Sequence, residues 1–222
     1  MESKKKRALL ISGGHINADY TVEYIKSKDY DIIIAIDGGL KAAENLDIIP
    51  DIVVGDFDTI DSGTLNKYAG MKEVEVIRLN PEKDLTDTQS AIERALSLGA
   101  DYIEIIGGTG TRLDHTIANI HTLQMMIGRC SGAVITNENN RIRIIEDKYV
   151  IKRQEQYGKY VSFLPLTEKV QGITLEGFKY PLKDYEFNIK TTLSLGVSNE
   201  IIEDEATVSL KSGRLIMIES RD

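Results

Sequence analysis

The pattern of apolar residues changes once along this chain of 222 residues, near residue 140. Before that point, short runs rich in β-branched residues alternate with segments whose apolar residues recur at helical spacing. After it, helical spacing disappears, and short apolar runs follow one another with turn residues between them. The two patterns predict two parts of different architecture, residues 1–138 and residues 139–222.

The first part is predicted to be an α/β domain with a mostly parallel, Rossmann-like sheet. Strand–helix alternation with near-continuous apolar strands is typical of a sheet covered on both faces. The expected strands are residues 8–11, 32–36, 52–54, 74–77, 102–106 and 133–136. One clear helix runs from about Thr86 to Leu98, with Thr86 and Gln89 as a capping box. Another runs from about Asp114 to Gly128, with Ile117 among its periodic apolar positions.

The second part is predicted to be a small antiparallel β-sandwich. Alternating apolar segments separated by Gly and Pro turns are typical of such a domain. The expected strands are residues 141–145, 149–151, 160–164, 172–176, 186–189, 206–210 and 214–218.

Charge and cysteine content exclude several classes of protein. The chain has 35 acidic and 27 basic residues, and its net charge of −8 argues against a nucleic-acid partner or an anionic membrane surface. The single cysteine, Cys130, rules out a disulfide framework, and no paired His or Cys spacing suggests structural zinc. No apolar stretch is long enough to span a bilayer. We therefore expect a cytoplasmic protein with no membrane partner.

Acidic residues follow several of the expected parallel strands, at the sheet edge where such folds bind ligands. A single Asp after a strand is most often a cap or turn residue. Several on one rim repel each other unless a cation lies among them, and all-oxygen ligands suit Mg²⁺. On an extended segment Asp56 and Asp58 would point the same way. Asp84 and Asp87 would share one face of a first helical turn.

Glycine-rich turns on the same rim predict a site for phosphate groups. Gly107, Gly108 and Gly110 free the backbone N–H groups after a strand, and the segment opens onto a helix N-terminus. Arg112 offers a bidentate fork for a phosphate. The segment is not a P-loop, because no Gly-Lys-Ser/Thr follows. Asp114 is expected to cap the helix.

Three features of the sequence each have two interpretations, one functional and one structural. His115 either contacts a nucleotide or lies in the first helical turn, and Gly38-Gly39 is either a tight strand–helix turn or part of a nucleotide site. Lys83 is a phosphate contact or a surface lysine beside Asp84. Magnesium with phosphate loops indicates phosphoryl or pyrophosphoryl transfer, hydrolysis, or nucleotide sensing.

In its motifs, the chain resembles the thiamine pyrophosphokinase family in its bacterial form. The motifs occur in the family's order and spacing: Asp37-Gly38-Gly39, Gly55-Asp56-Phe57-Asp58-Thr59, Lys83-Asp84-Leu85-Thr86-Asp87, Gly107 to His115, and Gly196-Val197-Ser198-Asn199-Glu200. Thr59 stands where the family usually has Ser, and Thr111 where Gly is common. The chain has no tryptophan, a residue that some relatives stack on thiamine.

The resemblance implies an enzyme that transfers the pyrophosphoryl group of ATP to thiamine, giving thiamine diphosphate and AMP. It implies Mg²⁺, and a homodimer with thiamine bound between subunits. Residues 1–138 would bind ATP and Mg²⁺, and residues 139–222 would bind thiamine and form the dimer. By analogy, the catalytic and metal-binding residues are Asp56, Asp58, Asp84 and Asp87. The nucleotide would contact Asp37, Gly38, Gly39, Lys83, Gly107, Gly108, Thr109, Arg112, Asp114 and His115. Thiamine would contact Ser198 and Asn199.

Two other functions remain open. A related pyrophosphokinase could act on another hydroxymethyl heterocycle, such as a pterin, although the segment Gly196–Glu200 favours thiamine. A non-catalytic nucleotide or thiamine sensor is the second alternative, although a binding protein has no need of a costly carboxylate cluster. In addition, Gly196–Glu200 taken without the resemblance is a plain turn between strands. Among the acids, one in the segment Lys83–Asp87 is the expected proton acceptor.

Overall fold

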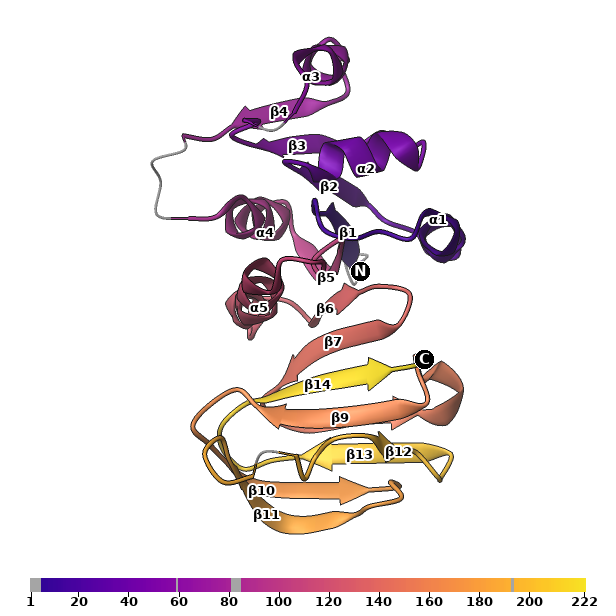
Figure 1. The fold of residues 1–222 in the computed structure, drawn as a ribbon, viewed down its shortest axis with the longest axis vertical. Helices are drawn as coiled ribbons and strands as arrows, with labels where there is room; N and C mark the ends of the chain where they lie inside the picture. The colour runs from indigo at the N-terminus through magenta and orange to yellow at the C-terminus, as the bar shows by residue number, and fades with distance from the viewer. Residues whose placement is uncertain (1–4, 59, 81–84, 193) are drawn as a thin grey trace. The chain divides into compact units, whose positions relative to one another are not determined.

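A computed structural model of the protein describes residues 5–58, 60–80, 85–192 and 194–222. The chain forms two compact units, Met1–Glu138 and Asn139–Asp222 (Figure 1). Each unit has its own buried apolar cluster. None of the described helices has both the length and the apolar character that crossing a membrane requires.

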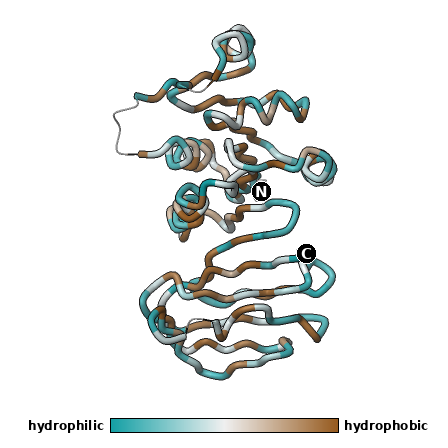
Figure 2. Tube along the Cα trace, viewed as in Figure 1, coloured by the Kyte–Doolittle hydropathy of each residue, from teal (hydrophilic) through white to brown (hydrophobic). Residues whose placement is uncertain are grey.

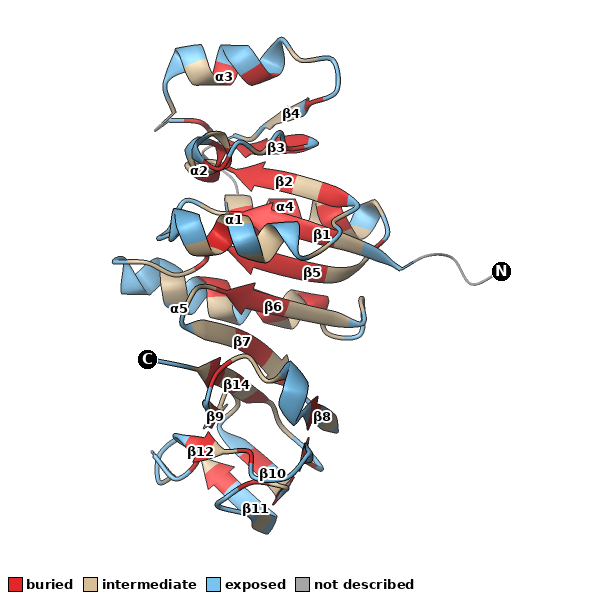
Figure 3. Ribbon diagram, turned by 90° about the vertical axis from the view of Figure 1, so that its right-hand side faces the viewer, coloured by how far each residue is buried: buried red, intermediate tan, exposed pale blue. Residues whose placement is uncertain are grey.

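Unit 1 contains the predicted parallel sheet. Its strands lie in the order β6-β5-β1-β2-β3-β4, and every neighbouring pair is parallel. The strand bounds are β1 Lys6–Ile11, β2 Ile32–Ile36, β3 Ile52–Gly55, β4 Glu75–Arg78, β5 Ala100–Ile106 and β6 Gly132–Thr136. The central residues of β1, β2, β3, β5 and β6 are buried, as Figure 3 shows, because helices cover both faces, whereas those of the edge strand β4 are half-buried. Each strand expected in this part of the sequence is confirmed.

The helices of unit 1 divide between the two faces of the sheet. α1 (Ala18–Lys26) and α2 (Gly39–Asn45) lie on one side, and α4 (Asp87–Ser97) and α5 (Leu113–Thr122) lie on the other (Figure 1). The short helix α3 (Ser62–Ala69) precedes β4. The chain proceeds outward from β1 to β4 and then returns to place β5 on the other side of β1. The loops after β1 and β5 therefore lead to opposite faces, which is where open α/β sheets form a ligand crevice.

Local signals placed α4 correctly and α5 only in part. Thr86 is the N-cap of α4; its hydroxyl accepts a hydrogen bond from the Gln89 N–H at 3.2 Å, and its own N–H donates to the Gln89 side chain at 2.8 Å. The predicted capping box is confirmed. α5 ends at Thr122 and continues as the 3₁₀ turn Leu123–Met126. Ile117, one of the periodic apolar positions of this helix, is 55% exposed.

Unit 2 is the predicted antiparallel sandwich. One sheet has the order β12-β9-β14-β7 and the other β11-β10-β13-β8, with antiparallel neighbours throughout. Its elements are β7 Asn140–Ile145, β8 Tyr149–Lys152, the 3₁₀ turn Arg153–Glu155, β9 Tyr160–Pro165, β10 Lys169–Glu176, β11 Leu182–Asn188, β12 Asn199–Glu200, β13 Glu205–Ser209 and β14 Leu215–Ser220. The two-residue strand β12 was not predicted.

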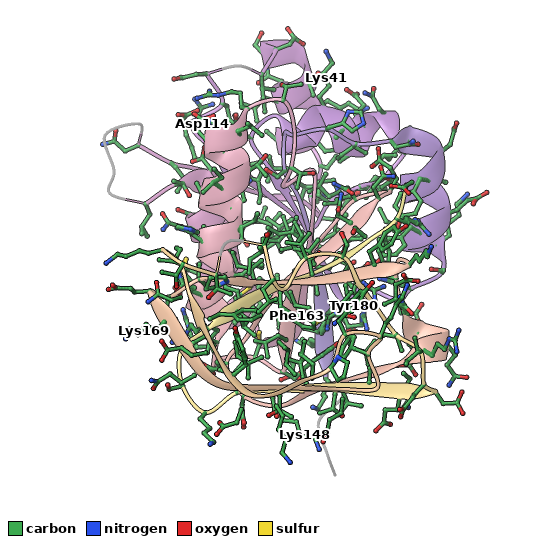
Figure 4. The ribbon with its side chains drawn as sticks, turned by 60° about the horizontal axis from the view of Figure 1, so that its bottom comes forward. Lys41, Asp114, Lys148, Phe163, Lys169 and Tyr180 are labelled. Carbon is green, nitrogen blue, oxygen red and sulfur yellow. The ribbon has the colours of Figure 1, made fainter. Side chains whose placement is uncertain are left out.

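The sandwich is held together by apolar side chains from both of its sheets. Phe163 on β9 and Phe187 on β11 are at most 1% exposed and belong to one cluster. Figure 4 shows Phe163 inside unit 2 and Lys169 at its periphery. Hydropathy follows the same division, with apolar strands and polar connections (Figure 2).

Candidate functional site

The loops that follow β1 and β5 are joined by backbone hydrogen bonds. The Gly14 N–H donates to the Gly107 carbonyl at 2.8 Å, and the His15 N–H donates to the Thr109 carbonyl at 2.7 Å. The two loops therefore form one continuous surface at the point where the strand order reverses.

This close approach of two backbones requires glycine. Gly107 has a φ of +64°, and a Cβ atom there would lie 2.2 Å from the Ser12 carbonyl oxygen. A Cβ atom on Gly14 would lie 2.3 Å from the carbonyl oxygens of both Gly107 and Thr109. Any larger residue would push the loops apart, so the glycine-rich motif has a specific structural cause.

A cavity of about 870 Å³ opens above these loops. Its walls come from the ends of β1, β2 and β5, from the first turn of α4 and from one side of α5. Eight of the residues that the resemblance assigns to the site line it: Asp37, Gly38, Asp87, Gly107, Gly108, Thr109, Arg112 and His115. Four other described candidates of this unit do not line it: Gly39, Asp56, Asp58 and Asp114.

The two acids that follow β3 form a turn rather than the extended segment that was expected. Phe57 between them has a φ of 63° and is only 6% exposed. The Asp58 N–H donates to Asp56 Oδ1 at 3.2 Å. Burial of the Phe57 ring in the core of unit 1 draws the backbone into this turn. Asp56 therefore also has the turn-forming role that is common for Asp.

Asp37 lies beside this turn. Its N–H donates to the Val54 carbonyl at 2.8 Å, and its own φ is 42°. The acids at the ends of β2 and β3 thus share one sheet edge, as predicted. Lys83 and Asp84 lie outside the described residues. Within the described ranges, no three His, Cys, Asp or Glu side chains are grouped so that they could hold a metal ion.

Arg112, not Asp114, occupies the N-cap position of α5, so the predicted capping role of Asp114 was wrong. Asp114 is one residue into the helix, and its carboxylate turns back to Arg112, with 2.6 Å between Arg112 Nη2 and Asp114 Oδ2. The hydrogen bond from Arg112 lowers the pKa of Asp114. Both side chains are largely exposed. No side chain caps α5, which leaves this N-terminus suited to an anion.

The buried side of α5 supports the glycine loop. Asn119 is 9% exposed, and its Nδ2 donates to the Gly108 carbonyl at 2.8 Å. The Asn137 side chain donates to Thr109 Oγ1, also at 2.8 Å. Sequence reasoning missed both residues. For Asn119 the available signal was an asparagine inside the expected helix of residues 114–128; Asn137 follows β6 and carried no such signal.

Every histidine of the chain lies at this cavity. The sequence contains three, and His15, His115 and His121 all line the cavity. His15 Nε2 lies 3.4 Å from Glu138 Oε1, and His115 Nε2 lies 3.9 Å from Asp114 Oδ2. Only His115 was predicted to belong to the site.

In unit 2, Ser198 and Asn199 have different surroundings. Asn199 is 4% exposed; its Nδ2 donates to the Tyr180 carbonyl at 2.8 Å, and its Oδ1 accepts from the Tyr180 N–H at 3.0 Å. Ser198 is exposed, has a φ of 58°, and donates its N–H to Ser162 Oγ at 3.0 Å. The Asn199 amide thus holds the backbone of Tyr180 in place. Tyr180 itself is 59% exposed. Sequence reasoning did not single out Tyr180.

Comparisons with known proteins agree with this arrangement. The family model described as "Thiamin pyrophosphokinase, catalytic domain" matches residues 24–134, and "Thiamin pyrophosphokinase, vitamin B1 binding domain" matches residues 148–215. The thiamine pyrophosphokinase of Bacillus subtilis (strain 168) is 34% identical over 198 residues, which cover 87% of this chain and 89% of that protein.

Solved structures are similar over almost the whole length. The crystal structure of the Bacillus subtilis thiamine pyrophosphokinase has a TM-score of 0.84 at 32% identity and covers 98% of this chain and 100% of its own. The crystal structure of the Geobacillus thermodenitrificans thiamin pyrophosphokinase has a TM-score of 0.83 at 27% identity. It covers 97% of this chain and 98% of its own. The chain therefore belongs to the thiamine pyrophosphokinase family of enzymes.

Proposed function

We propose that this protein is a thiamine diphosphokinase, which transfers the pyrophosphoryl group of ATP to the hydroxyl of thiamine and releases AMP. The observation that carries the proposal is the match to both family domains in their order, on a chain whose cavity lies at the reversal of the sheet. The cavity volume is in the range of small-molecule sites. Unit 1 is the proposed ATP-binding unit, and unit 2 the proposed thiamine-binding and dimerisation unit.

The polyphosphate of ATP is assigned to the loop between β5 and α5. Gly107, Gly108 and Thr109 line the cavity, and the uncapped N-terminus of α5 favours negative charge. Arg112 is paired with Asp114 in the structure, and its guanidinium can exchange this exposed carboxylate for a phosphate. Gly38 and His115 line the same cavity and are included in the nucleotide site, with Asp37.

The donor set at the sheet edge fits Mg²⁺. Asp56, Asp58 and Asp87 carry carboxylates in this region, and Asp84 is a further acid that lies outside the described residues. Mg²⁺ commonly takes one or two carboxylates and completes its shell with water and substrate phosphates, so it does not require three protein ligands in advance. When bound, it would neutralise phosphate charge during transfer.

The reaction requires that the two substrates be correctly positioned and that a group of the protein accept the hydroxyl proton of thiamine. The thiamine oxygen forms a bond to the β-phosphorus while the bond from that phosphorus to the oxygen of AMP breaks, and the hydroxyl proton passes to a carboxylate. Asp87, in the first turn of α4 and on the cavity wall, is the described candidate for this role. The Thr86 capping box fixes the backbone at that turn.

Thiamine recognition is assigned to the exposed surface around Ser198 in unit 2. Tyr180 presents an aromatic ring there, and an aromatic face attracts a cationic ring such as the thiazolium of thiamine. Asn199 is a positioning residue in this proposal, because both polar atoms of its amide hold the Tyr180 backbone. Tyr180 would thus replace the missing tryptophan.

A homodimer, with thiamine between subunits, completes the proposal. Sedimentation of the pure protein at micromolar concentration should give about twice the chain mass of 24.8 kDa. A monomer that remains fully active would contradict this arrangement.

The deciding experiment is an incubation of the purified protein with ATP, Mg²⁺ and thiamine, followed by chromatography of the products. AMP and thiamine diphosphate should appear together, and only when thiamine is present. Release of ADP would indicate transfer of a single phosphoryl group and contradict the mechanism. Turnover with a hydroxymethylpterin in place of thiamine would identify the related pyrophosphokinase activity instead.

An Asp87→Asn variant distinguishes an enzyme from a sensor. The enzyme should lose nearly all turnover, because the variant lacks a carboxylate at the cavity wall. A sensor would have no turnover to lose and would retain its ATP affinity, measured by calorimetry.

A further inference from the structure

The backbone carbonyls of residues 107–109, in the loop after β5, are all held by donors of the protein. In chain order, they accept hydrogen bonds from the Gly14 N–H at 2.8 Å, from Asn119 Nδ2 at 2.8 Å and from the His15 N–H at 2.7 Å. Two of these donors are backbone groups of the loop after β1. The third is a side chain of α5, so a separate element of the fold holds the middle carbonyl.

The backbone N–H groups of the same loop are in a different situation. Within the part of the chain that the structure describes, neither the Gly108 N–H nor the Thr109 N–H donates a hydrogen bond, and both residues line the large cavity. The next N–H, that of Gly110, donates to Thr116 Oγ1 at 3.2 Å. Successive N–H groups without acceptors, beside carbonyls that already have donors, form a site that attracts an anion.

The orientation of the peptide between Gly108 and Thr109 depends on Asn119. None of the described peptide bonds is cis, and in a trans peptide the C=O and the following N–H point in opposite directions. The Asn119 amide holds the Gly108 carbonyl toward α5, so the Thr109 N–H points away from that helix. Glycine adopts positive and negative φ about equally well, so Gly108 does not fix this orientation by itself.

Loss of the Asn119 amide would leave the Gly108 carbonyl without a donor. Gly108 is buried, and a buried carbonyl without a partner is costly. Rotation of the peptide toward the water of the cavity would give the carbonyl a new donor at little cost to a glycine. The same rotation would bring the negative end of the C=O dipole to the cavity and turn the Thr109 N–H away.

We propose that Asn119 is a positioning residue for the reaction, which holds the Gly108 carbonyl and so keeps the Thr109 N–H available to the phosphates of ATP. The inference rests on the proposed function, and it concerns how the protein orders its own backbone. Asn119 is suited to this role because it is 9% exposed and lies inside α5, so its side chain has little freedom to move.

The first test is Asn119→Leu, which removes the donor and keeps a side chain of similar shape. KM for ATP should rise about tenfold while KM for thiamine stays within about twofold, because one hydrogen bond to a charged phosphate is lost and a carbonyl dipole opposes it. A purely structural role would lower the fraction of folded enzyme, and hence kcat, with both KM values unchanged. A folded variant with the wild-type KM for ATP would overturn the proposal.

The matched control is Thr136→Val at the end of β6. Thr136 is 1% exposed, donates to Glu104 Oε1 at 2.8 Å and does not line the cavity. This variant loses a buried hydrogen bond of the same length in the same unit. It should lower the midpoint of urea denaturation and leave KM for ATP unchanged. An equal rise of KM in both variants would show that any buried hydrogen bond of unit 1 has this effect, and would overturn the specific role of Asn119.

A measurement on the wild type does not require that any variant folds. NMR of isotope-labelled protein follows the Thr109 amide proton during titration with Mg²⁺ and the ATP analogue that has a methylene group between its α- and β-phosphorus atoms. The proton should move downfield, because it begins to donate to a phosphate oxygen, and in Asn119→Leu this shift should be lost. A Thr109 proton that does not move when the analogue saturates the wild type contradicts the proposal.

The same titration separates failure of this inference from failure of the proposed function. If the wild type makes no thiamine diphosphate, but its Thr109 proton responds to the analogue and that of Asn119→Leu does not, the positioning role holds and the proposed function fails. If thiamine diphosphate is made and the Thr109 proton does not respond, the proposed function holds and the positioning role fails. Absence of analogue binding together with absence of product overturns both.

Discussion

Gly107 and Gly128 both have positive φ angles, of 64° and 70°, but their surroundings differ. A Cβ atom at Gly107 would meet the Ser12 carbonyl oxygen at 2.2 Å, whereas at Gly128 nothing lies within 4 Å. Gly128→Ala should therefore lower the free energy of unfolding by about 1–2 kcal/mol, the cost of the left-handed backbone alone. Gly107→Ala should lower it more and abolish ATP binding.

Urea denaturation and calorimetry with ATP measure both effects for the two glycines. Equal losses of stability in both variants, with ATP binding kept in each, would show that the loops do not need their close approach.

Glu104 on β5 is a fully buried carboxylate with several partners. Oε1 accepts from the Tyr24 hydroxyl at 2.5 Å and from Thr136 Oγ1 at 2.8 Å. Oε2 accepts from Lys28 Nζ at 2.9 Å and from the Tyr30 hydroxyl at 2.8 Å. Burial acts to raise the pKa of Glu104, but the Lys28 charge and these hydrogen bonds together hold its pKa below the ordinary value. The same burial and the nearby carboxylate raise the pKa of Tyr30.

Glu104→Gln should lower the free energy of unfolding at pH 7 by about 1–3 kcal/mol, since hydrogen bonds to a charged group are lost. A depressed folded-state pKa contributes stability above the unfolded pKa of about 4.3, and this is lost as the pH falls through the folded pKa. The difference between wild type and variant should thus narrow below about pH 4. Urea titrations from pH 7 to pH 3 test it.

The control for Glu104 is Glu93→Gln, an exposed carboxylate paired with Arg129, which should cost much less because water screens it. A difference for Glu104→Gln that is the same at every pH would contradict the charged state assigned to this carboxylate.

At the scale of one element, α4 depends on its first turn. Thr86→Ala removes the hydroxyl that accepts the Gln89 N–H and should lower the free energy of unfolding by about 1 kcal/mol. Thr86→Ser keeps a hydroxyl and should stay close to wild type. Chemical denaturation followed by circular dichroism measures both. Equal stability of the alanine and serine variants would mean that the cap contributes nothing.

At the scale of the whole molecule, each unit has an apolar core of its own. A ligand that binds only the folded state raises the free energy of unfolding. The increase is about 2.7 kcal/mol when the ligand concentration is one hundred times its Kd. ATP with Mg²⁺ should slow hydrogen exchange in residues 107–115, and thiamine should slow it in residues 196–200. Mass spectrometry of exchanged peptides resolves the two. Protection of residues 196–200 by ATP alone would contradict the assignment of substrates to units.

Local signals in the sequence determined most of the fold. The strands of unit 1 were predictable because a strand buried on both faces must be apolar along its length. The α4 start was predictable because a capping box involves residues only three apart. The glycine-rich loop and its position after β5 were also visible, together with the acids at the sheet edge.

Tertiary structure alone decided the features that depend on distant partners. Burial of the Phe57 ring in the core turned the Asp56–Asp58 segment, which an extended pattern did not predict. β12 is a strand only because it pairs with β9, and two residues carry no periodic signal. Asn199 acquired its role from the Tyr180 backbone, 19 residues away. Such contacts join residues far apart in the chain, so no local sequence pattern predicts them. Helix caps and apolar runs, in contrast, depend on neighbouring residues.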